Sequence, residues 1–287
     1  MIPTQILNSW KKVNDRIDEF CGGNRENCFT VIFITDVHTG GNNNIEHLKY
    51  INKLLKLNPV DFIINGGDIG IDIGENAEEA RRVISATKQG MDFDVPHILI
   101  KGNHDHKFEI YSNYELLAYL NQSSLKFLSK NFKIVFDEEN GGFYGYFIDS
   151  KTSTRLIFSN TSECLDSAYH ISDTQLKWFI KTLDECEEDN LVIFSHLCPN
   201  ECGSWLSSGN LEKSISIYES IEKDFANKRN GHYKNFRWDF TNKKTKLALH
   251  MSGDSHFNNE STKDGFLCVC RQGYGGVDPA EMPEGSS

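Results

Sequence analysis

The chain has 287 residues, and its 38% hydrophobic and 25% charged residues are ordinary for a globular protein in water. Its net charge of −11, from 41 acidic and 30 basic residues, argues against broad binding of nucleic acids or anionic membranes. No apolar run approaches the ~18 residues that a membrane-spanning helix needs. The first residues, Met1 to Gln5, lack the pattern of a secretory signal, so the sequence predicts a cytoplasmic protein.

The eight cysteines are scattered along a chain that is too long to need disulfides for its stability. Reduced thiols are therefore expected. Cys198 with Cys202 could form half of a zinc site, as could Cys268 with Cys270. Neither pair has a second pair at the spacing of a zinc finger, which weakens this alternative.

The first part of the chain predicts alternating helices and strands. Apolar side chains at helical spacing predict helices over residues 4–20 and 45–55, and capping residues predict two more that begin near Asn76 and Ser112. Apolar, β-branched runs predict strands at residues 30–35, 61–65 and 95–100. This alternation is typical of an α/β arrangement.

The rest of the chain predicts successive strands before the alternation resumes. Strands are predicted at residues 132–136, 142–148, 155–159, 191–195 and 247–252, and helices from Ser172 and over residues 211–225. Mixed sheets flanked by helices fit this order. Because no repeat, linker or break in composition appears, we expect one domain over residues 1–278. A helix over residues 1–20 is expected to pack on it, and residues 279–287 to form a flexible tail.

Five of the predicted strands run directly into polar residues that can bind metals. The strands are followed by Asp36-Val37-His38, Gly66-Gly67-Asp68, Gly102-Asn103-His104-Asp105, His196 and Gly253-Asp254-Ser255-His256. Loops beyond the carboxyl ends of strands are where open α/β sheets place their chemistry. One such loop could be an ordinary polar turn, but five strands followed by such residues are not expected by chance. Carboxylates and imidazoles without a thiolate suit Mn, Fe or Zn.

These motifs, in this order, resemble those of the calcineurin-like metallophosphoesterases over roughly Phe29 to Tyr274. The Gly-Asn-His-Asp element and the order of the blocks are the most specific parts of the resemblance. The resemblance sharpens the fold to two mixed β-sheets packed face to face and flanked by helices, an α/β (α+β) fold. It implies an enzyme, a metal-dependent phosphoric ester hydrolase. Phosphate mono- or diesters would be cleaved by a hydroxide that bridges two metals.

The resemblance also assigns roles to the residues of the motifs. The implied metal ligands are Asp36, His38 and His256 for one ion, Asn103 and His196 for the other, and Asp68 as the bridge. Two divalent ions are expected, Mn or Fe in the first place, with Zn or Mg as alternatives. His104 would protonate the departing oxygen as general acid, and Asp105 would orient the imidazole of His104.

Two positions depart from the family's pattern. The last block of the family is usually Gly-His-x-His, and Asp254 stands where its first histidine is expected. We expect Asp254 to bind the second metal in place of that histidine, although the side chain could instead turn away. The family often has an acidic residue three positions after its second metal aspartate, where this chain has Ile71, and no role is carried over to Asp72.

Substrate contacts are less defined. Residues Lys228 to Lys246 contain seven basic residues and one acidic residue, interleaved with aromatic side chains. This stretch could be a solvated, partly packed connection. Alternatively, Arg237 and Trp238 could grip a phosphorylated or nucleotide-like substrate by charge and stacking. His106 and His250 lie near motifs and are candidates for contacts to the substrate or to a metal ligand.

Two non-enzymatic functions stay open. The chain could be an inactive family member that serves as a binding scaffold, but His104 argues against this because a scaffold needs no acid. It could be a nucleic-acid-binding module, but the net charge argues against that. The expected partner is a phosphate-ester substrate, without a membrane or a stable nucleic-acid complex. The sequence leaves open the oligomeric state and the choice between mono- and diester.

Overall fold

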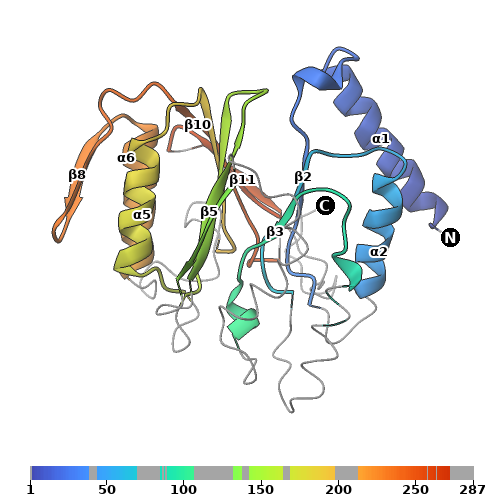
Figure 1. Ribbon diagram of the computed structural model, residues 1–287, viewed down its shortest axis with the longest axis horizontal. Helices are drawn as coiled ribbons and strands as arrows, with labels where there is room; N and C mark the ends of the chain where they lie inside the picture. The colour runs from blue at the N-terminus through green and yellow to red at the C-terminus, as the bar shows by residue number, and fades with distance from the viewer. Residues whose placement is uncertain are drawn as a thin grey trace.

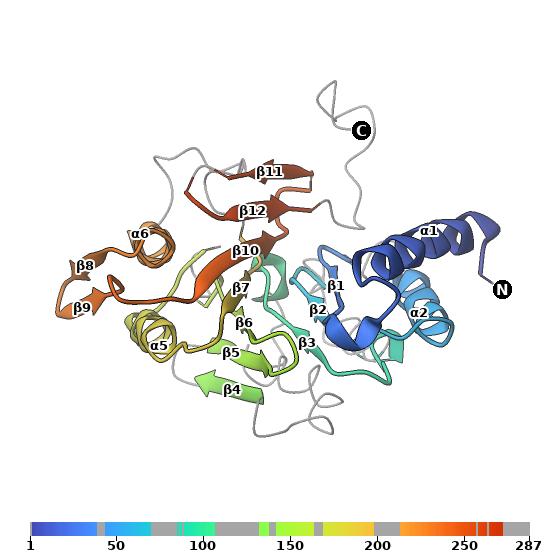
Figure 2. The same ribbon diagram turned by 90° about the horizontal axis from the view of Figure 1, so that it is seen from above.

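The computed structural model describes residues 2–38, 44–69, 85, 87, 89–106, 132–137, 142–163, 169–197, 213–256, 258–262 and 264–271. In this part of the chain, two β-sheets lie against each other between two pairs of helices (Figures 1 and 2). The helices are α1 (Thr4–Phe20) and α2 (Asn44–Leu55) on one side, and α5 (Asp173–Asp184) and α6 (Lys213–Ala226) on the other. This arrangement confirms the predicted fold class.

The smaller sheet has three parallel strands in the order β1 (Val31–Ile34), β2 (Phe62–Asn65) and β3 (His97–Leu99). It is therefore not mixed within the described residues. Ile34 pairs with Asn65, and Asn65 pairs with Leu99, so the carboxyl ends of the strands lie level at one edge. Parallel strands are usually covered on both faces, which is why these runs are almost continuously apolar. The helices predicted from Asn76 and Ser112 lie outside the described residues.

The larger sheet is mixed and has the strand order β11-β12-β10-β7-β6-β5-β4. Its strands are β4 (Phe132–Asp137), β5 (Gly142–Asp149), β6 (Thr154–Phe158), β7 (Asn190–Phe194), β10 (Lys246–Ser252), β11 (Asn259–Ser261) and β12 (Leu267–Cys270). The central strands β6, β7, β10 and β12 are parallel, and the outer pairs are antiparallel. The sequence did not predict β11 and β12.

Two apolar layers hold these elements together. Between the sheets, Phe33 of β1 stacks on Phe194 of β7 with the ring centroids 5.8 Å apart. Between the larger sheet and its helices, Phe179 of α5 and Tyr218 of α6 stack at 4.4 Å. Burial of one large apolar side chain contributes roughly 1.5–3 kcal/mol. The two apolar layers therefore hold the ends of the strands in fixed positions.

Residues in the basic and aromatic stretch form a β-hairpin that the sequence did not predict, β8 (Asn230–Tyr233) and β9 (Phe236–Asp239). The hairpin lies beyond α5 and α6, on the side of these helices that faces away from the sheets (Figure 1). Trp238 is 7% exposed, and its Nε1–H donates to a carboxylate oxygen of Asp224 at 3.0 Å. Lys234 pairs with Asp173 of α5 at 2.7 Å. These contacts are those of a packed connection.

The cysteines depart from the expectation of reduced thiols at one place. Cys21 and Cys28, just after α1, form a disulfide with their Cα atoms 6.1 Å apart. Cys186, Cys268 and Cys270 are buried free thiols, and Cys198 and Cys202 lie outside the described residues. Among the described residues, no helix combines the length and the apolar character that crossing a membrane requires.

Candidate metal centre

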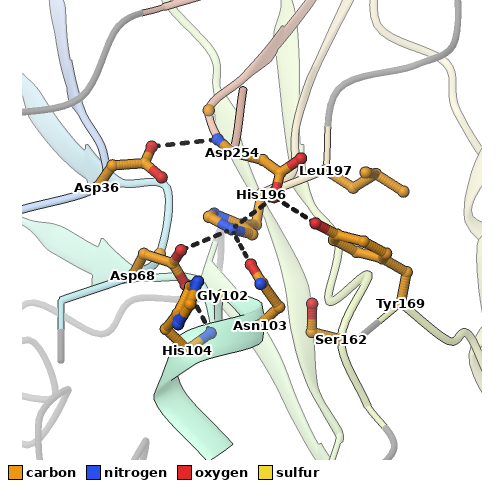
Figure 3. A network of polar contacts seen from close by, with 12 residues as sticks. Asp36, Asp68, Gly102, Asn103, His104, Ser162, Tyr169, His196, Leu197 and Asp254 are labelled. Carbon is orange, nitrogen blue, oxygen red and sulfur yellow. Dashed lines mark hydrogen bonds and ion pairs between the residues drawn. The ribbon is translucent and has the colours of Figure 1, made fainter. Parts of the chain in front are cut away.

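The polar residues that follow the strands meet at one edge of the two sheets. Asp36, Asp68 and Asn103 follow β1, β2 and β3, whereas His196 follows β7 and Asp254 follows β10 (Figure 3). The site is thus built from the carboxyl ends of parallel strands in both sheets, where open α/β folds place ligands. The face-to-face packing of the sheets is what brings the two halves together.

The first group of candidate ligands consists of Asp36, His38, Asp68 and His256, whose possible ligand atoms all lie within 4.8 Å of one another. The Nε2 atoms of His38 and His256 are 3.2 Å apart, and Nε2 of His256 lies 3.2 Å from Oδ1 of Asp36. This Oδ1 atom is buried and otherwise has no hydrogen-bond donor. A buried carboxylate oxygen without a donor is costly unless a cation lies beside it. The group therefore fits a divalent metal.

The second group is centred on His196. Its Nε2 atom lies 2.8 Å from Oδ1 of Asn103, 3.3 Å from Oδ2 of Asp68 and 3.5 Å from Oδ1 of Asp254. Its Nδ1 atom lies 2.8 Å from the carbonyl oxygen of Gly66; when the ring is neutral, donation from Nδ1–H to this oxygen leaves Nε2 available as a ligand. This hydrogen bond to the far nitrogen is the usual way in which proteins orient a metal-binding histidine. Because Asp68 belongs to both groups, its position suits a bridging ligand.

The backbone at these positions is unusual. A left-handed backbone, rare for residues other than glycine, occurs at most of the candidate ligands: φ is 52° at Asp36, 46° at His38, 51° at Asp68, 68° at Asp254 and 56° at His256. Each such residue costs roughly 1–2 kcal/mol, and strained positions of this kind concentrate at functional sites. The apolar layers beneath the site supply the stability that holds them.

Two glycines are required by the close approach of the loops. A Cβ atom on Gly102 would overlap with the side chain and the backbone nitrogen of Asp68. A Cβ atom on Gly253 would overlap with the side chains of Thr35 and Asp36. The glycines that precede Asn103 and Asp254 are therefore part of the geometry of the site.

Asp105 is buried and contacts backbone rather than solvent. Its Oδ2 atom accepts the backbone N–H of Asp68 at 2.9 Å and that of Gly102 at 2.8 Å. The carboxylate thereby ties the loop after β2 to the loop after β3, a function that the sequence did not predict. Its expected contact with the imidazole of His104 stays a prediction.

His104 lies beside the ligands without being part of the first group. Its ring is 5.6 Å from the ring of His38, centroid to centroid, and Figure 3 shows it next to Asp68. Its backbone N–H donates to Oδ1 of Asp68 at 2.9 Å. A half-buried imidazole in this place can reach a substrate held at the ligands, as a general acid must.

The charges of the ligands shift one another's pKa values in the metal-free protein. Burial raises the pKa of Asp68, but the charge of His196, the hydrogen bond to it and the contacts with His104 together outweigh burial and lower this pKa to about 2. Burial lowers the pKa of His196, but its contacts with the carboxylates of Asp68, Asp254 and Asp36 together outweigh burial and raise this pKa well above 6.5. The contact with Asp36 raises the pKa of His256, whereas burial lowers the pKa of His38. In the metal-free protein, protons on the histidines therefore compensate part of the negative charge that metal cations would otherwise compensate.

Sequence reasoning missed Tyr169. Its hydroxyl donates to Oδ1 of Asp254 at 2.6 Å (Figure 3). Burial, and then the charge of Asp254, raise the pKa of Tyr169, so the hydroxyl keeps its proton. Tyr169 lies in the segment before α5 and follows no strand end, and 85 positions separate it from Asp254. No local pattern could have identified it.

Sequence reasoning also missed a buried relay behind His196. Nε2 of His250 lies 2.7 Å from Oγ of Ser195, and Nδ1 of His250 lies 2.8 Å from a carboxylate oxygen of Glu222. Ser195 Oγ also donates to the carbonyl oxygen of Leu197 at 2.9 Å. All three side chains of the relay are at most 1% exposed. The relay therefore supports the backbone on both sides of His196 from within the core.

Two of the residues predicted to bind substrate, Arg237 and Trp238, are not brought to the site. Arg237 and Trp238 belong to the β8–β9 hairpin, which lies across α5 and α6 from the strand ends (Figure 1). Trp238 is largely buried, so its ring is not presented for stacking. The side chain of His106 lies outside the described residues.

The site gathers carboxylates and imidazoles from two packed sheets around one shared aspartate, which is the ligand chemistry of a metal-dependent enzyme. The chain belongs to the calcineurin-like phosphoesterase family, whose sequence profile matches residues 29–258. The family confirms the predicted enzyme class, a metal-dependent phosphoric ester hydrolase. No curated protein sequence matches the chain.

The fold is similar to that of a solved dimetal phosphatase, and further solved structures match at lower TM-scores. A dimetal phosphatase from Danio rerio has a TM-score of 0.63 and 15% identity over 88% of this chain and 90% of that one. A purple acid phosphatase from yellow lupin (Lupinus luteus) seeds has a TM-score of 0.47 and 14% identity over 88% of this chain and 45% of that one. A phosphopantetheinyl hydrolase from Mycobacterium tuberculosis has a TM-score of 0.44 and 14% identity over 88% and 98%. At these identities the similarity concerns the fold alone, and only the TM-score of 0.63 is high enough to support it.

Proposed function

We propose that the protein hydrolyses phosphate mono- or diesters at two divalent metal ions, with His104 as general acid. The proposed ligands are Asp36, His38 and His256 for one ion, Asn103, His196 and Asp254 for the other, and Asp68 for both. When bound, two such ions neutralise charge on the phosphoryl group and activate a water molecule. The remaining chemistry belongs to the side chains of this chain.

The position of Asp68 carries this proposal. It is one of the residues of the first group, all of whose ligand atoms lie within 4.8 Å of one another, and its Oδ2 atom lies 3.3 Å from Nε2 of His196 in the second group. Asp36, Asp68 and Asp254 together place three carboxylates in a site where each is at most 6% exposed. Carboxylates gathered away from water repel one another unless cations compensate them.

His104 is proposed to deliver a proton to the oxygen that leaves the phosphorus. General acid catalysis of this kind is typically worth about 10²–10⁴ in rate. The hydrogen bond from its backbone N–H to Asp68 holds the backbone of His104 beside the proposed bridging carboxylate. A substrate phosphoryl group held beside Asp68 would therefore lie close to the residue that carries the imidazole.

The metals and the location are finer parts of the proposal. We favour Mn or Fe, with Zn or Mg as alternatives, because hard carboxylate oxygens make up much of the proposed ligand set. The predicted cytoplasmic location stays a prediction. The disulfide between Cys21 and Cys28 argues against a strongly reducing compartment.

The test begins with metal-free protein reconstituted separately with Mn²⁺, Fe²⁺, Zn²⁺ and Mg²⁺. Elemental analysis should find two ions per chain, and rates on p-nitrophenyl phosphate and bis(p-nitrophenyl) phosphate should separate monoesterase from diesterase activity. Asp68→Asn should lose metal and activity together. Asp239→Asn, at an exposed position on β9, is the matched control. Full metal occupancy without turnover of either substrate would favour the scaffold alternative instead.

A further inference from the structure

Asp254 is the ligand at which this chain departs from its family, and its surroundings differ accordingly. Its Oδ1 atom accepts a hydrogen bond from the Tyr169 hydroxyl at 2.6 Å and lies 3.5 Å from Nε2 of His196. Its backbone N–H donates to Oδ2 of Asp36 at 3.1 Å. Backbone and side chain of Asp254 are thus held from two directions, by a ligand of the first group and by Tyr169 (Figure 3).

Tyr169 is itself held firmly by the residue that follows it. The backbone N–H of His170 donates to the carbonyl oxygen of Thr161 at 2.9 Å, and its carbonyl oxygen accepts the N–H of Glu163 at 3.1 Å. These bonds attach the segment to the chain that leaves β6. The phenol ring therefore approaches Asp254 from a fixed backbone, half-buried beside the site.

The chemistry of this pair suits a carboxylate that replaces an imidazole. A neutral histidine brings no charge to a metal site, whereas an aspartate brings a negative charge on a shorter side chain. Ligating carboxylates are commonly hydrogen-bonded in turn, and such partners orient the ligand and adjust its strength. A hydrogen bond to an ionised acceptor is roughly twice as strong as one between neutral groups. The Tyr169 hydroxyl, 2.6 Å from Oδ1 of Asp254, can both orient this carboxylate and adjust its strength as a ligand.

We propose that Tyr169 is a positioning residue that holds Asp254 in the orientation of a ligand for the second metal ion and withdraws part of its negative charge. This inference rests on the proposed function, because it assumes that the second group binds a metal. It extends that function to the way in which this chain keeps a second site without the family's histidine. Tyr169 and Asp254 then form one functional unit.

The experiment compares Mn²⁺ binding to wild-type protein, Tyr169→Phe, Asp254→His and the double variant by titration calorimetry of the metal-free proteins. Tyr169→Phe should weaken binding at one of the two sites about 10–100-fold, the usual effect of losing a partner of a metal ligand, and leave the other site unchanged. In the Asp254→His background the same change should have almost no effect. Saturating Mn²⁺ should restore most of the phosphatase rate of Tyr169→Phe.

Tyr146→Phe is the matched control, since it removes a hydroxyl from a half-buried tyrosine on β5 whose ring lies 4.7 Å from the guanidinium of Arg155. Unchanged affinities in Tyr169→Phe would overturn the inference. So would equal weakening at both sites, which indicates a general structural effect, and so would equal effects in both backgrounds. A wild-type protein that binds two ions without hydrolysing phosphate esters would refute the proposed function while the binding data still decide the role of Tyr169.

Discussion

The backbone N–H of His104 donates to Oδ1 of Asp68 at 2.9 Å, so a direct hydrogen bond joins the proposed acid to the proposed bridging ligand. Asp105 reinforces this link, because its carboxylate accepts the backbone N–H groups of Asp68 and Gly102. The loops after β2 and β3 are thereby joined through two hydrogen bonds, and a third, from Gly102 to Asp105, holds the second loop in shape. A change that displaces the backbone of either loop is expected to affect both metal binding and the delivery of the proton.

Replacing the acid should separate chemistry from metal binding. His104→Ala is expected to keep both ions and to lose about 10²–10⁴ in kcat on substrates with alkoxide leaving groups. The loss should shrink on nitrophenolate, which leaves without a proton. Steady-state rates on both substrate types, with metal content measured in parallel, check this. His232→Ala, an exposed histidine of β8, is the control. Equal losses on both leaving groups would show that His104 has another role.

Removing Asp105 should cost stability as well as activity. Asp105→Ala leaves the buried N–H groups of Asp68 and Gly102 without this acceptor, at about 1–3 kcal/mol for each unsatisfied group. We therefore expect a lower free energy of unfolding, measured by urea denaturation of the metal-free protein, together with weaker metal binding. Asp92→Ala, at an exposed position before β3, should change neither. A variant as stable as the wild type would contradict the structural role assigned to Asp105.

The relay behind His196 should behave as a structural support. Glu222→Ala removes the carboxylate that faces Nδ1 of His250 in the core and leaves a buried N–H group without an acceptor, at about 1–3 kcal/mol. The urea midpoint should fall, while kcat at saturating metal changes little. Glu185→Ala, whose side chain is exposed at the end of α5, is the control for losing a carboxylate. A large loss of kcat at unchanged stability would instead place His250 in the chemistry.

Metal binding should depend on pH through the histidines. In the metal-free protein the pKa values of His196 and His256 are raised above 6.5, so both rings hold protons that a metal must displace. Affinity for Mn²⁺ should therefore fall as pH falls through these raised values, with more protons released per ion. Calorimetry in buffers of different ionisation enthalpy measures the release. Histidines usually change charge between about pH 5 and 8. An affinity that stays constant over this range would contradict the assignment of these ligands.

The stability of the metal-free protein should show the opposite trend. A raised histidine pKa contributes stability that is complete below the unfolded value of 6.5 and is lost as pH rises through the folded value. The contribution of His196 and His256 to the stability of the metal-free protein should thus fall on going from mildly acidic to alkaline pH, while metal affinity improves. Urea unfolding with and without Mn²⁺ across this range separates the two effects.

The charge of Asp254 should set the metal preference. With Asp36, Asp68 and Asp254 ionised, three negative charges oppose two divalent ions, one more than with histidine at position 254. Asp254→His should improve activity with Zn²⁺ relative to Mn²⁺ and move the pH–rate profile to lower pH, since more net positive charge acts on the bound water. Unchanged preference and an unchanged profile would show that Asp254 does not reach the metal.

Local patterns in the sequence determined the secondary structure and the positions of the motif residues. The helical spacing over residues 4–20 matches α1, and the successive strands after Phe132 match β4, β5 and β6. Asp36 and Asp68 could be placed at one edge because each directly follows an apolar run, and parallel strands have their carboxyl ends on the same side. Such features depend on neighbours in the chain.

The contacts between distant segments were decided only by the tertiary structure. Tyr169 reaches Asp254 because the segment after β6 and the loop after β10 meet above the same sheet, although 85 positions separate them. Asp105 bonds to backbone, and Trp238 lies buried against Asp224, for the same reason. A polar or aromatic residue has several chemically acceptable partners, and the packing of the layers determines which partner lies within reach. The left-handed backbone at Asp36 and Asp68 likewise depends on the close approach of two loops, which no run of neighbouring residues encodes.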